Sequence, residues 1–96
     1  MNSSHIIAKL KAERGALDRL GVSSLRLFGS LARDAAEAGS DADFLVRFEG
    51  DASYDRYMDL KDHLEDSLGM PVDLVTEDAL RPELRQSVER DALLVA

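Results

Sequence analysis

The chain has 96 residues, of which 45% are hydrophobic and 32% charged, and its 12 basic and 19 acidic side chains give a formal net charge of −7. This acidity argues against direct, sequence-independent binding of nucleic-acid backbones, and the absence of cysteine excludes disulfides and thiolate zinc sites. The length predicts a single domain over residues 1–96, and without an apolar stretch of membrane-spanning length or a signal-peptide core we expect a cytoplasmic protein that does not bind membranes.

The first elements expected are a helix and a strand. Residues 3–20 carry apolar side chains at roughly helical spacing, which predicts a helix with Ser3 or Ser4 as its N-cap. Gly21 is a natural stop for that helix. A short strand follows at residues 25–28, where the run Leu-Arg-Leu-Phe is mostly apolar.

Two further strands and three further helices are expected in the rest of the chain. In order they are a short helix at 31–36, a strand at 42–48, a helix at 53–68, a strand at 72–75 and a helix at 82–91. Residues 37–40 are expected to form a loop, and the tail at 92–95 either extends the last helix or forms a short strand. This order predicts an α/β (α+β) fold, in which a small mixed three- or four-stranded sheet is flanked by helices on one or both faces.

Gly29 and Ser30 form a candidate phosphate-binding turn between the first strand and the short helix. Glycine lets the backbone come close to a ligand oxygen, and Ser30 opens a helix whose first N–H groups have no partners within that helix. Arg33, one turn later, is placed to add a charge-assisted contact. A Gly-Ser pair alone is usually an ordinary turn with an N-cap, so its meaning depends on the residues that follow.

Three aspartates form a candidate metal site. Asp41 and Asp43 are separated by one residue, so an extended chain presents both on one face, with their Cα atoms about 7 Å apart. Asp73 stands in a third apolar run, where a carboxylate is costly to bury unless it is paired or bound to a metal. If the second and third strands are neighbours, Asp73 joins the other two, and such oxygens are the ligands that Mg²⁺ prefers. Taken alone, each aspartate is more readily explained as a solvated loop, strand or edge residue, so the prediction depends on the ordered set.

The ordered set of turn and carboxylates resembles the nucleotidyltransferase superfamily that includes DNA polymerase beta. The strings Phe28-Gly-Ser-Leu-Ala-Arg33 and Ser40-Asp-Ala-Asp-Phe-Leu-Val-Arg-Phe48 look like the minimal nucleotidyltransferases of prokaryotes, and the resemblance covers nearly the whole chain. It implies the nucleotidyltransferase fold and a Mg²⁺-dependent enzyme that transfers AMP from ATP to a hydroxyl. The site residues that it implies are the catalytic and metal-binding Asp41, Asp43 and Asp73 and the phosphate-binding Gly29, Ser30 and Arg33.

The resemblance also implies a partner. In the antitoxin members of this family, known as MntA, the acceptor is a tyrosine hydroxyl of a HEPN-domain ribonuclease toxin. We therefore expect the antitoxin of a type VII-like toxin–antitoxin pair, which forms a hetero-oligomer with its toxin. Two alternatives stay open, namely a non-catalytic antitoxin that neutralises by direct binding and a stand-alone nucleotidyltransferase for a small molecule. The complete motif favours the enzyme over the contact antitoxin, and the small size and acidity disfavour the stand-alone enzyme.

Overall fold

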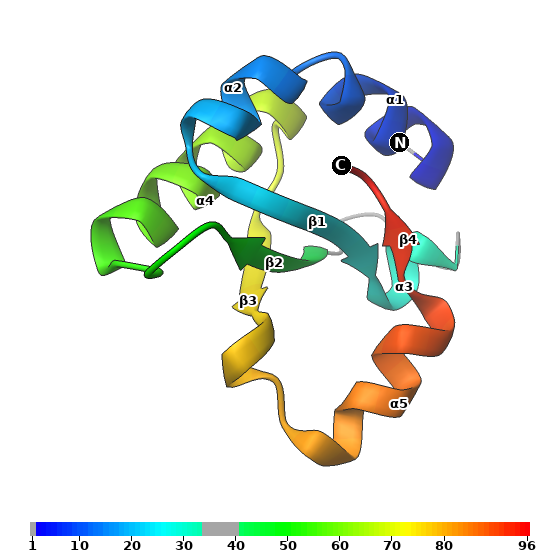
Figure 1. Cartoon of the computed structure of the whole chain (residues 1–96). Helices are drawn as coiled ribbons and strands as arrows, with labels where there is room; N and C mark the ends of the chain where they lie inside the picture. Colours follow the sequence, from blue (N-terminus) through cyan, green and yellow to red (C-terminus); the bar gives the residue numbers. More distant parts are fainter. Residues whose placement is uncertain (1, 34–40) are drawn as a thin grey trace.

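The computed structural model describes residues 2–33 and 41–96, and its elements alternate between helices and strands (Figure 1). In chain order they are α1 (Ser3–Lys11), α2 (Arg14–Arg19), β1 (Val22–Phe28), α3 (Gly29–Ala32), β2 (Ala42–Phe48), α4 (Tyr54–Leu68), β3 (Val72–Thr76), the 3₁₀ turn η1 (Glu77–Ala79), α5 (Pro82–Asp91) and β4 (Leu93–Leu94). No helix within these described ranges is long and apolar enough to cross a bilayer.

The strands form one mixed four-stranded sheet in the order β3-β2-β1-β4. β1 is antiparallel to both β2 and β4, whereas β2 and β3 are parallel. A parallel pair needs a crossover connection, and α4 provides it between β2 and β3. The mixed sheet expected from the sequence is therefore confirmed, with four strands rather than three.

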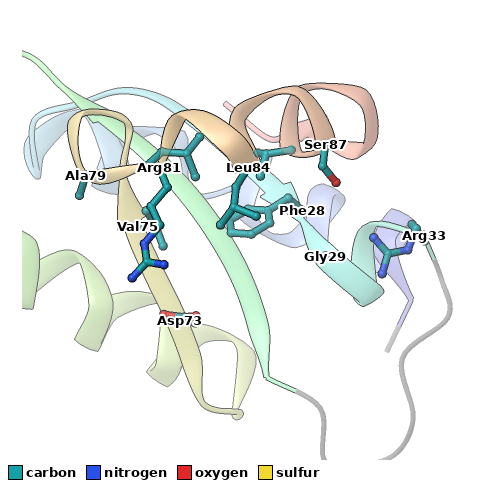
Figure 2. Close-up of a pocket in the computed structure, with 11 residues that line it drawn as sticks. Phe28, Gly29, Arg33, Asp73, Val75, Ala79, Arg81, Leu84 and Ser87 are labelled. Carbon is teal, nitrogen blue, oxygen red and sulfur yellow. The ribbon is translucent and has the colours of Figure 1, made fainter.

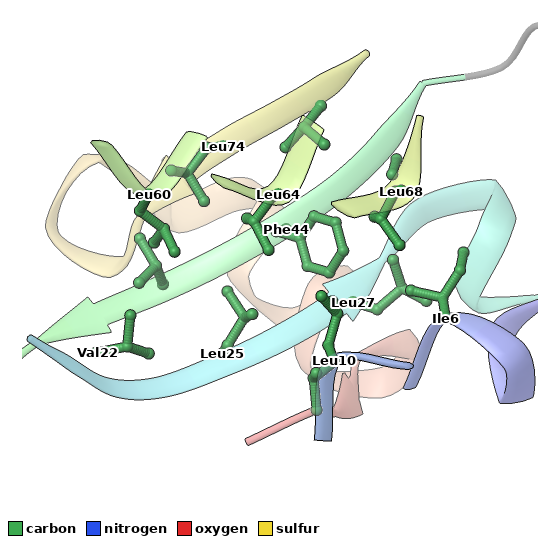
Figure 3. Close-up of a cluster of buried hydrophobic side chains, with 14 of the residues drawn as sticks. Ile6, Leu10, Val22, Leu25, Leu27, Phe44, Leu60, Leu64, Leu68 and Leu74 are labelled. Atoms are coloured by element: carbon green, nitrogen blue, oxygen red, sulfur yellow. The ribbon is translucent and has the colours of Figure 1, made fainter. Parts of the chain in front are cut away.

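The main hydrophobic core lies between one face of the sheet and the helices α1, α2 and α4 (Figure 1). Phe44 of β2 is fully buried at its centre, with Leu64 of α4 and Leu10 of α1 drawn around it (Figure 3). Val46 is also fully buried and Phe48 nearly so, as expected for alternate residues of one strand.

A smaller cluster lies on the opposite face of the sheet, beneath α5. It consists of the buried residues Leu45, Leu80 and Val88, with Phe28, Val75 and Ala92 packed against them. Helices therefore cover both faces, but α5 leaves part of the second face open. The candidate site lies on this second face.

α4 also covers the outer edge of β3. The Tyr57 hydroxyl donates a hydrogen bond of 2.6 Å to the Leu74 carbonyl, and the Val72 N–H donates one of 2.9 Å to a Glu65 carboxylate oxygen. These main-chain groups belong to the terminal strand of the sheet, so α4 side chains supply partners that a fifth strand would otherwise provide.

The N-terminal helix differs from the prediction. The expected helix at 3–20 is interrupted at Ala12 and Glu13, and the Asn2 side chain caps it by accepting the His5 N–H at 2.9 Å, so the predicted serine caps are wrong. The Glu13 carboxylate lies 2.8 Å from His63 Nε2 and accepts a hydrogen bond of 2.5 Å from the Ser67 hydroxyl. These contacts tie the break between α1 and α2 to α4.

Two other boundaries also differ from the expectations, and the tail takes one of its two expected forms. β1 begins at Val22, three residues early, because it pairs with β2 as far as Phe48. The predicted helix at 31–36 begins at Gly29 instead, and the part of it beyond residue 33, like the predicted loop at 37–40, lies outside the described residues. The tail forms the short strand β4.

We expect Leu64→Ala to lower the free energy of unfolding by about 2–5 kcal/mol, because it opens a cavity beside Phe44 in the main core. Leu94→Ala is the matched control, since Leu94 is 62% exposed on β4 and its loss should change stability by no more than about 0.5 kcal/mol. Urea denaturation followed by circular dichroism measures both, and equal losses would contradict the assignment of the core.

Candidate functional site

The strand register brings Gly29, Asp43 and Asp73 together. Phe28 pairs with Asp43 across the antiparallel β1 and β2, and Asp43 pairs with Asp73 across the parallel β2 and β3. Both carboxylates therefore lie on neighbouring strands at the same height, on the sheet face opposite Phe44. Gly29 follows Phe28 directly and so stands at the same end of the sheet.

Asp43 occupies an electrostatically unfavourable position. Its half-burial raises its pKa above the ordinary value, and the nearby charges of Asp73 and then Asp41 raise it further. The Arg33 guanidinium acts in the opposite direction and lowers it. A cluster of repelling carboxylates beside one cation is an arrangement that gains stability when further positive charge binds.

Gly29 allows the turn after β1 to lie directly against Asp43. Its φ of 73° is in the left-handed region, which residues with a Cβ rarely adopt. A Cβ built on Gly29 would overlap Oδ2 of Asp43. Glycine is therefore required here twice, by the backbone conformation and by the approach of the carboxylate.

The remaining predicted phosphate ligands are Ser30, on α3, and Arg33, which directly follows this single helical turn. Ser30 is its second residue, so the chain enters the helix where the prediction placed the anion-binding N–H groups. Arg33 ends the turn, where its N–H donates a hydrogen bond of 3.3 Å to the Gly29 carbonyl. The guanidinium of Arg33 is exposed and faces the same cleft as Asp73 (Figure 2).

Asp41 immediately precedes β2 and is exposed. It is near enough to raise the pKa of Asp43, yet among residues 2–33 and 41–96 no three side chains of the His, Cys, Asp and Glu types converge as a ready-made ligand set. The structure thus brings Asp43 and Asp73 together and leaves Asp41 at their margin. The paired carboxylates fit a hard divalent cation in donor type and in charge, and the role of all three as ligands stays a prediction.

A cleft of about 400 Å³ opens between α5, β3 and α3 (Figure 2). It is mostly apolar, with charged side chains at its ends. Its lining consists of Phe28, Gly29, Arg33, Asp73, Val75, Ala79, Leu80, Arg81, Leu84, Ser87 and Val88. We name it the α5 cleft.

Sequence reasoning did not identify the residues that α5 brings to this cleft. Arg81 extends from the start of α5 toward Asp73, and Leu84 lies one turn later (Figure 2). Arg81 and Leu84 are spaced as residues on one side of any surface helix are. This spacing does not indicate which face of the sheet the helix covers. The available signal was Arg81-Pro82, which marks the start of a helix shortly after the Asp73 strand.

Comparison with known proteins agrees with this geometry. Residues 7–95 match the family described as nucleotidyltransferase domain. A Methanocaldococcus jannaschii protein provisionally named a protein adenylyltransferase is 38% identical over 79 residues, which cover 81% of each protein. The protein adenylyltransferase MntA of Thermococcus cleftensis is 37% identical over 78 residues, covering 81% of this chain and 79% of that relative.

Solved structures show the same fold. A structure provisionally named a minimal nucleotidyltransferase superposes with a TM-score of 0.83 at 39% identity, covering 97% of this chain and 95% of the other. A toxin–antitoxin crystal structure with AMP-PNP gives 0.74 at 22% identity, covering 92% and 72%. A tri-AMPylated Shewanella oneidensis HEPN toxin in complex with MNT antitoxin gives 0.61 at 20%, covering 91% and 70%. At these lower identities the last two support the fold alone.

The raised pKa of Asp43 predicts a specific dependence of stability on pH. A native pKa above the unfolded one means that the folded chain holds the proton more tightly, so stability falls as pH rises from the unfolded pKa, near 4, through the folded pKa. Asp43→Asn removes this penalty. With a chelator present, its melting temperature should exceed that of the wild type at pH 7, and the difference should vanish at acidic pH.

The matched control is Asp59→Asn, on the exposed side of α4, which should show no such crossover. Thermal unfolding by calorimetry from pH 3 to pH 8 measures the difference for both variants. A constant offset between Asp43→Asn and the wild type at every pH would contradict the raised pKa.

Gly29→Ala should perturb both the backbone and Asp43, whereas Gly69→Ala should perturb only the backbone. Gly69 ends α4 with a φ of 66° and has open space where a Cβ would be. Each substitution should lower the free energy of unfolding by about 1–2 kcal/mol through left-handed strain. Only Gly29→Ala should also change the Asp43 titration, measured by carboxyl ¹³C chemical shifts. Identical titrations in the two variants would show that Gly29 does not position Asp43.

Proposed function

The chain belongs to the nucleotidyltransferase domain family, and on that premise we propose that it transfers AMP from ATP to a hydroxyl of a partner protein. The family confirms the resemblance and the enzyme class expected from the sequence, and the fold of its structural neighbours confirms the expected architecture. The donor, the cation, the acceptor and the partner are the parts of the proposal that go beyond the family.

One observation supports the proposal most strongly. Asp43 and Asp73 lie side by side on parallel strands, and the Gly29 turn lies against the Asp43 carboxylate. A turn of this kind can bind phosphate oxygens through main-chain N–H groups, whereas carboxylates repel a phosphate unless a cation lies between them. The juxtaposition of the two is therefore suited to a nucleoside triphosphate bound together with Mg²⁺.

Each residue has a defined role in the proposed reaction. Asp43 and Asp73, with Asp41 beside them, would hold Mg²⁺. When bound, the cation neutralises triphosphate charge and acidifies the attacking hydroxyl. The backbone of Gly29 and Ser30 holds the β and γ phosphates, so the pyrophosphate leaves toward α3.

Arg33 and Asp73 act at opposite ends of the transfer. The Arg33 guanidinium offsets the charge that develops on pyrophosphate as its bond to the α-phosphorus breaks. Asp73 accepts the proton of the acceptor hydroxyl as the new bond from oxygen to phosphorus forms. The products are the AMP ester of the acceptor and pyrophosphate.

The relatives support a protein acceptor. The Thermococcus cleftensis relative is named a protein adenylyltransferase, and the two neighbours of lower identity belong to toxin–antitoxin assemblies, one with AMP-PNP and one with a tri-AMPylated HEPN toxin. We therefore propose that the chain is the antitoxin of a type VII-like pair. Its acceptor is a tyrosine hydroxyl of a HEPN-domain ribonuclease toxin, with which it forms a hetero-oligomer.

The test is transfer of AMP to the protein encoded beside this chain. We expect incubation with labelled ATP and Mg²⁺ to add one or more AMP units to the neighbour, measured by intact mass, and chelation of Mg²⁺ to abolish the gain. Asp41→Asn/Asp43→Asn should lower the rate more than about 100-fold, because both carboxylates are proposed metal ligands. Asp59→Asn/Asp62→Asn removes the same charge from the exposed side of α4 and should leave the rate unchanged.

Other outcomes would contradict the proposal in different ways. Tight binding of the neighbour without any mass gain, unaffected by the double substitution in the site, would identify an antitoxin that acts by contact. Efficient modification of free small molecules, with no effect of the neighbour, would identify a stand-alone nucleotidyltransferase.

A further inference from the structure

Three hollows follow one another around the 3₁₀ turn η1. A groove of about 530 Å³ adjoins the α5 cleft, because Val75 and Ala79 line both of them (Figure 2). A third hollow, of about 490 Å³, adjoins this groove and shares Ala52, Thr76 and Asp78 with it. The hollowed surface therefore continues from the candidate site, past the end of β3, to the loop that follows β2.

The groove next to the α5 cleft is mostly apolar and lies between Tyr54, Tyr57, Val75 and Ala79, and we name it the η1 groove. Tyr54 is 76% exposed. Tyr57, one turn later on α4, is held in place by the hydrogen bond from its hydroxyl to the Leu74 carbonyl. An apolar hollow beside a solvent-exposed aromatic side chain is typical of a surface that binds another protein.

The third hollow is mostly polar and carries a negative charge. Asp51, Glu77 and Asp78 line it, with Arg47 as the only cation among its lining residues, and we name it the acidic hollow. Within residues 2–33 and 41–96, none of these three carboxylates has an ion-pair partner. They attract a cationic group and repel phosphates, so the charge disfavours a nucleic acid or an anionic membrane as the occupant.

We propose that the η1 groove and the acidic hollow together form the docking surface for the acceptor protein. The segment that binds there presents an apolar side chain to Tyr54 and a lysine or arginine to the carboxylates of the acidic hollow. This inference rests on the function proposed above, which requires a partner protein to reach Asp73. Because the η1 groove borders the α5 cleft at Val75 and Ala79, a partner bound here is held beside the candidate site.

The two parts of the surface contribute to binding in different ways. Covering the exposed ring of Tyr54 removes apolar surface from water, which stabilises the complex once it has formed. The unpaired carboxylates act over a longer range, so they speed the encounter with a basic segment and make it sensitive to salt. Neither part touches the reacting atoms, so both position the acceptor without taking part in the transfer.

The first test is the steady-state kinetics of AMP transfer to the protein encoded beside this chain. Tyr54→Ser should raise the KM for that protein about 10-fold, as expected for truncating an interface aromatic, and leave kcat and the KM for ATP unchanged. Tyr54→Phe keeps the ring and should retain the wild-type KM. Leu94→Ser is the matched control, since Leu94 is 62% exposed on β4, at the opposite edge of the sheet from β3.

The second test is the association rate with the same protein, measured by stopped-flow at increasing NaCl concentration. Asp51→Asn/Glu77→Gln/Asp78→Asn should slow association at low salt and reduce its dependence on salt, with little change in the dissociation rate. Asp59→Asn/Asp62→Asn/Asp66→Asn removes the same charge from exposed positions of α4 and should keep the wild-type salt dependence.

Several results would overturn the docking surface. Wild-type values of KM and of the salt dependence in the substituted chains would do so, as would losses shared equally by the two controls. A lower kcat for Tyr54→Ser at unchanged KM would assign Tyr54 to the reaction instead. Self-association of the chain that is lost in Tyr54→Ser, with no change in KM, would identify a second copy as the occupant.

Calorimetric titration separates this inference from the proposed function. If the wild type binds the neighbouring protein but transfers no AMP to it, the proposed function fails. The docking surface is then judged by affinity, which Tyr54→Ser should weaken about 10-fold and Leu94→Ser should leave unchanged. If the wild type does not bind that protein at all, the docking surface is overturned as well.

Discussion

The register of β2 between β1 and β3 is the constraint on which the rest of the molecule depends. Alternate residues of β2 enter the main core, with Phe44 at its centre, and the residues between them, Asp43 among them, lie on the opposite face of the sheet, which carries the candidate site. A slip of one residue would exchange these faces, moving Asp43 into the core and Phe44 onto the surface. The hydrophobic packing against α4 therefore fixes not only the fold but also the place of the carboxylate. The same packing holds Asp73 and Gly29 beside it, because both are defined relative to β2.

The site brings negative charges close together, which is electrostatically unfavourable in the protein without a ligand. Asp43 is half-buried, faces Asp73 and senses Asp41, with Arg33 as the cation that partly compensates. Such an arrangement is stable only because the other side of the sheet contributes the apolar packing that outweighs it. A bound cation would compensate the charge of these carboxylates. Folding of the isolated chain therefore favours protonated Asp43, whereas cation binding favours ionised Asp43.

The sequence predicts most of the fold because its signals are local. β2 and α5 have the expected bounds, and α4 begins one residue later than expected, since alternation, helical spacing and the stop at Gly69 all lie within the elements themselves. The break between α1 and α2 was not predictable in this way. It is tied to contacts of Glu13 with residues 50 and 54 positions away, and such pairs leave no periodic pattern.

Some residues of the candidate site could be predicted from local sequence, and others could not. The spacing of Gly29, Asp41 and Asp43 lies within one short segment, and Asp73 stands out as a carboxylate in an apolar run, so residue type and order were sufficient to select them. Arg81 and Leu84 reach the cleft only because α5 packs over the face opposite the main core. That choice depends on contacts between Leu45 of β2, Leu80 in the link between η1 and α5, and Val88 of α5, which no single stretch of sequence expresses.

The covered edge of β3 has a consequence for how this molecule meets other chains. The Val72 N–H donates its hydrogen bond to Glu65, and the Leu74 carbonyl accepts one from Tyr57. An extended segment of another protein therefore cannot pair with these groups of β3 unless it first displaces both α4 side chains. Main-chain pairing would accept almost any sequence, so closing this edge removes an indiscriminate mode of association. Association of another chain at this edge then depends on side-chain shape and charge rather than on main-chain pairing.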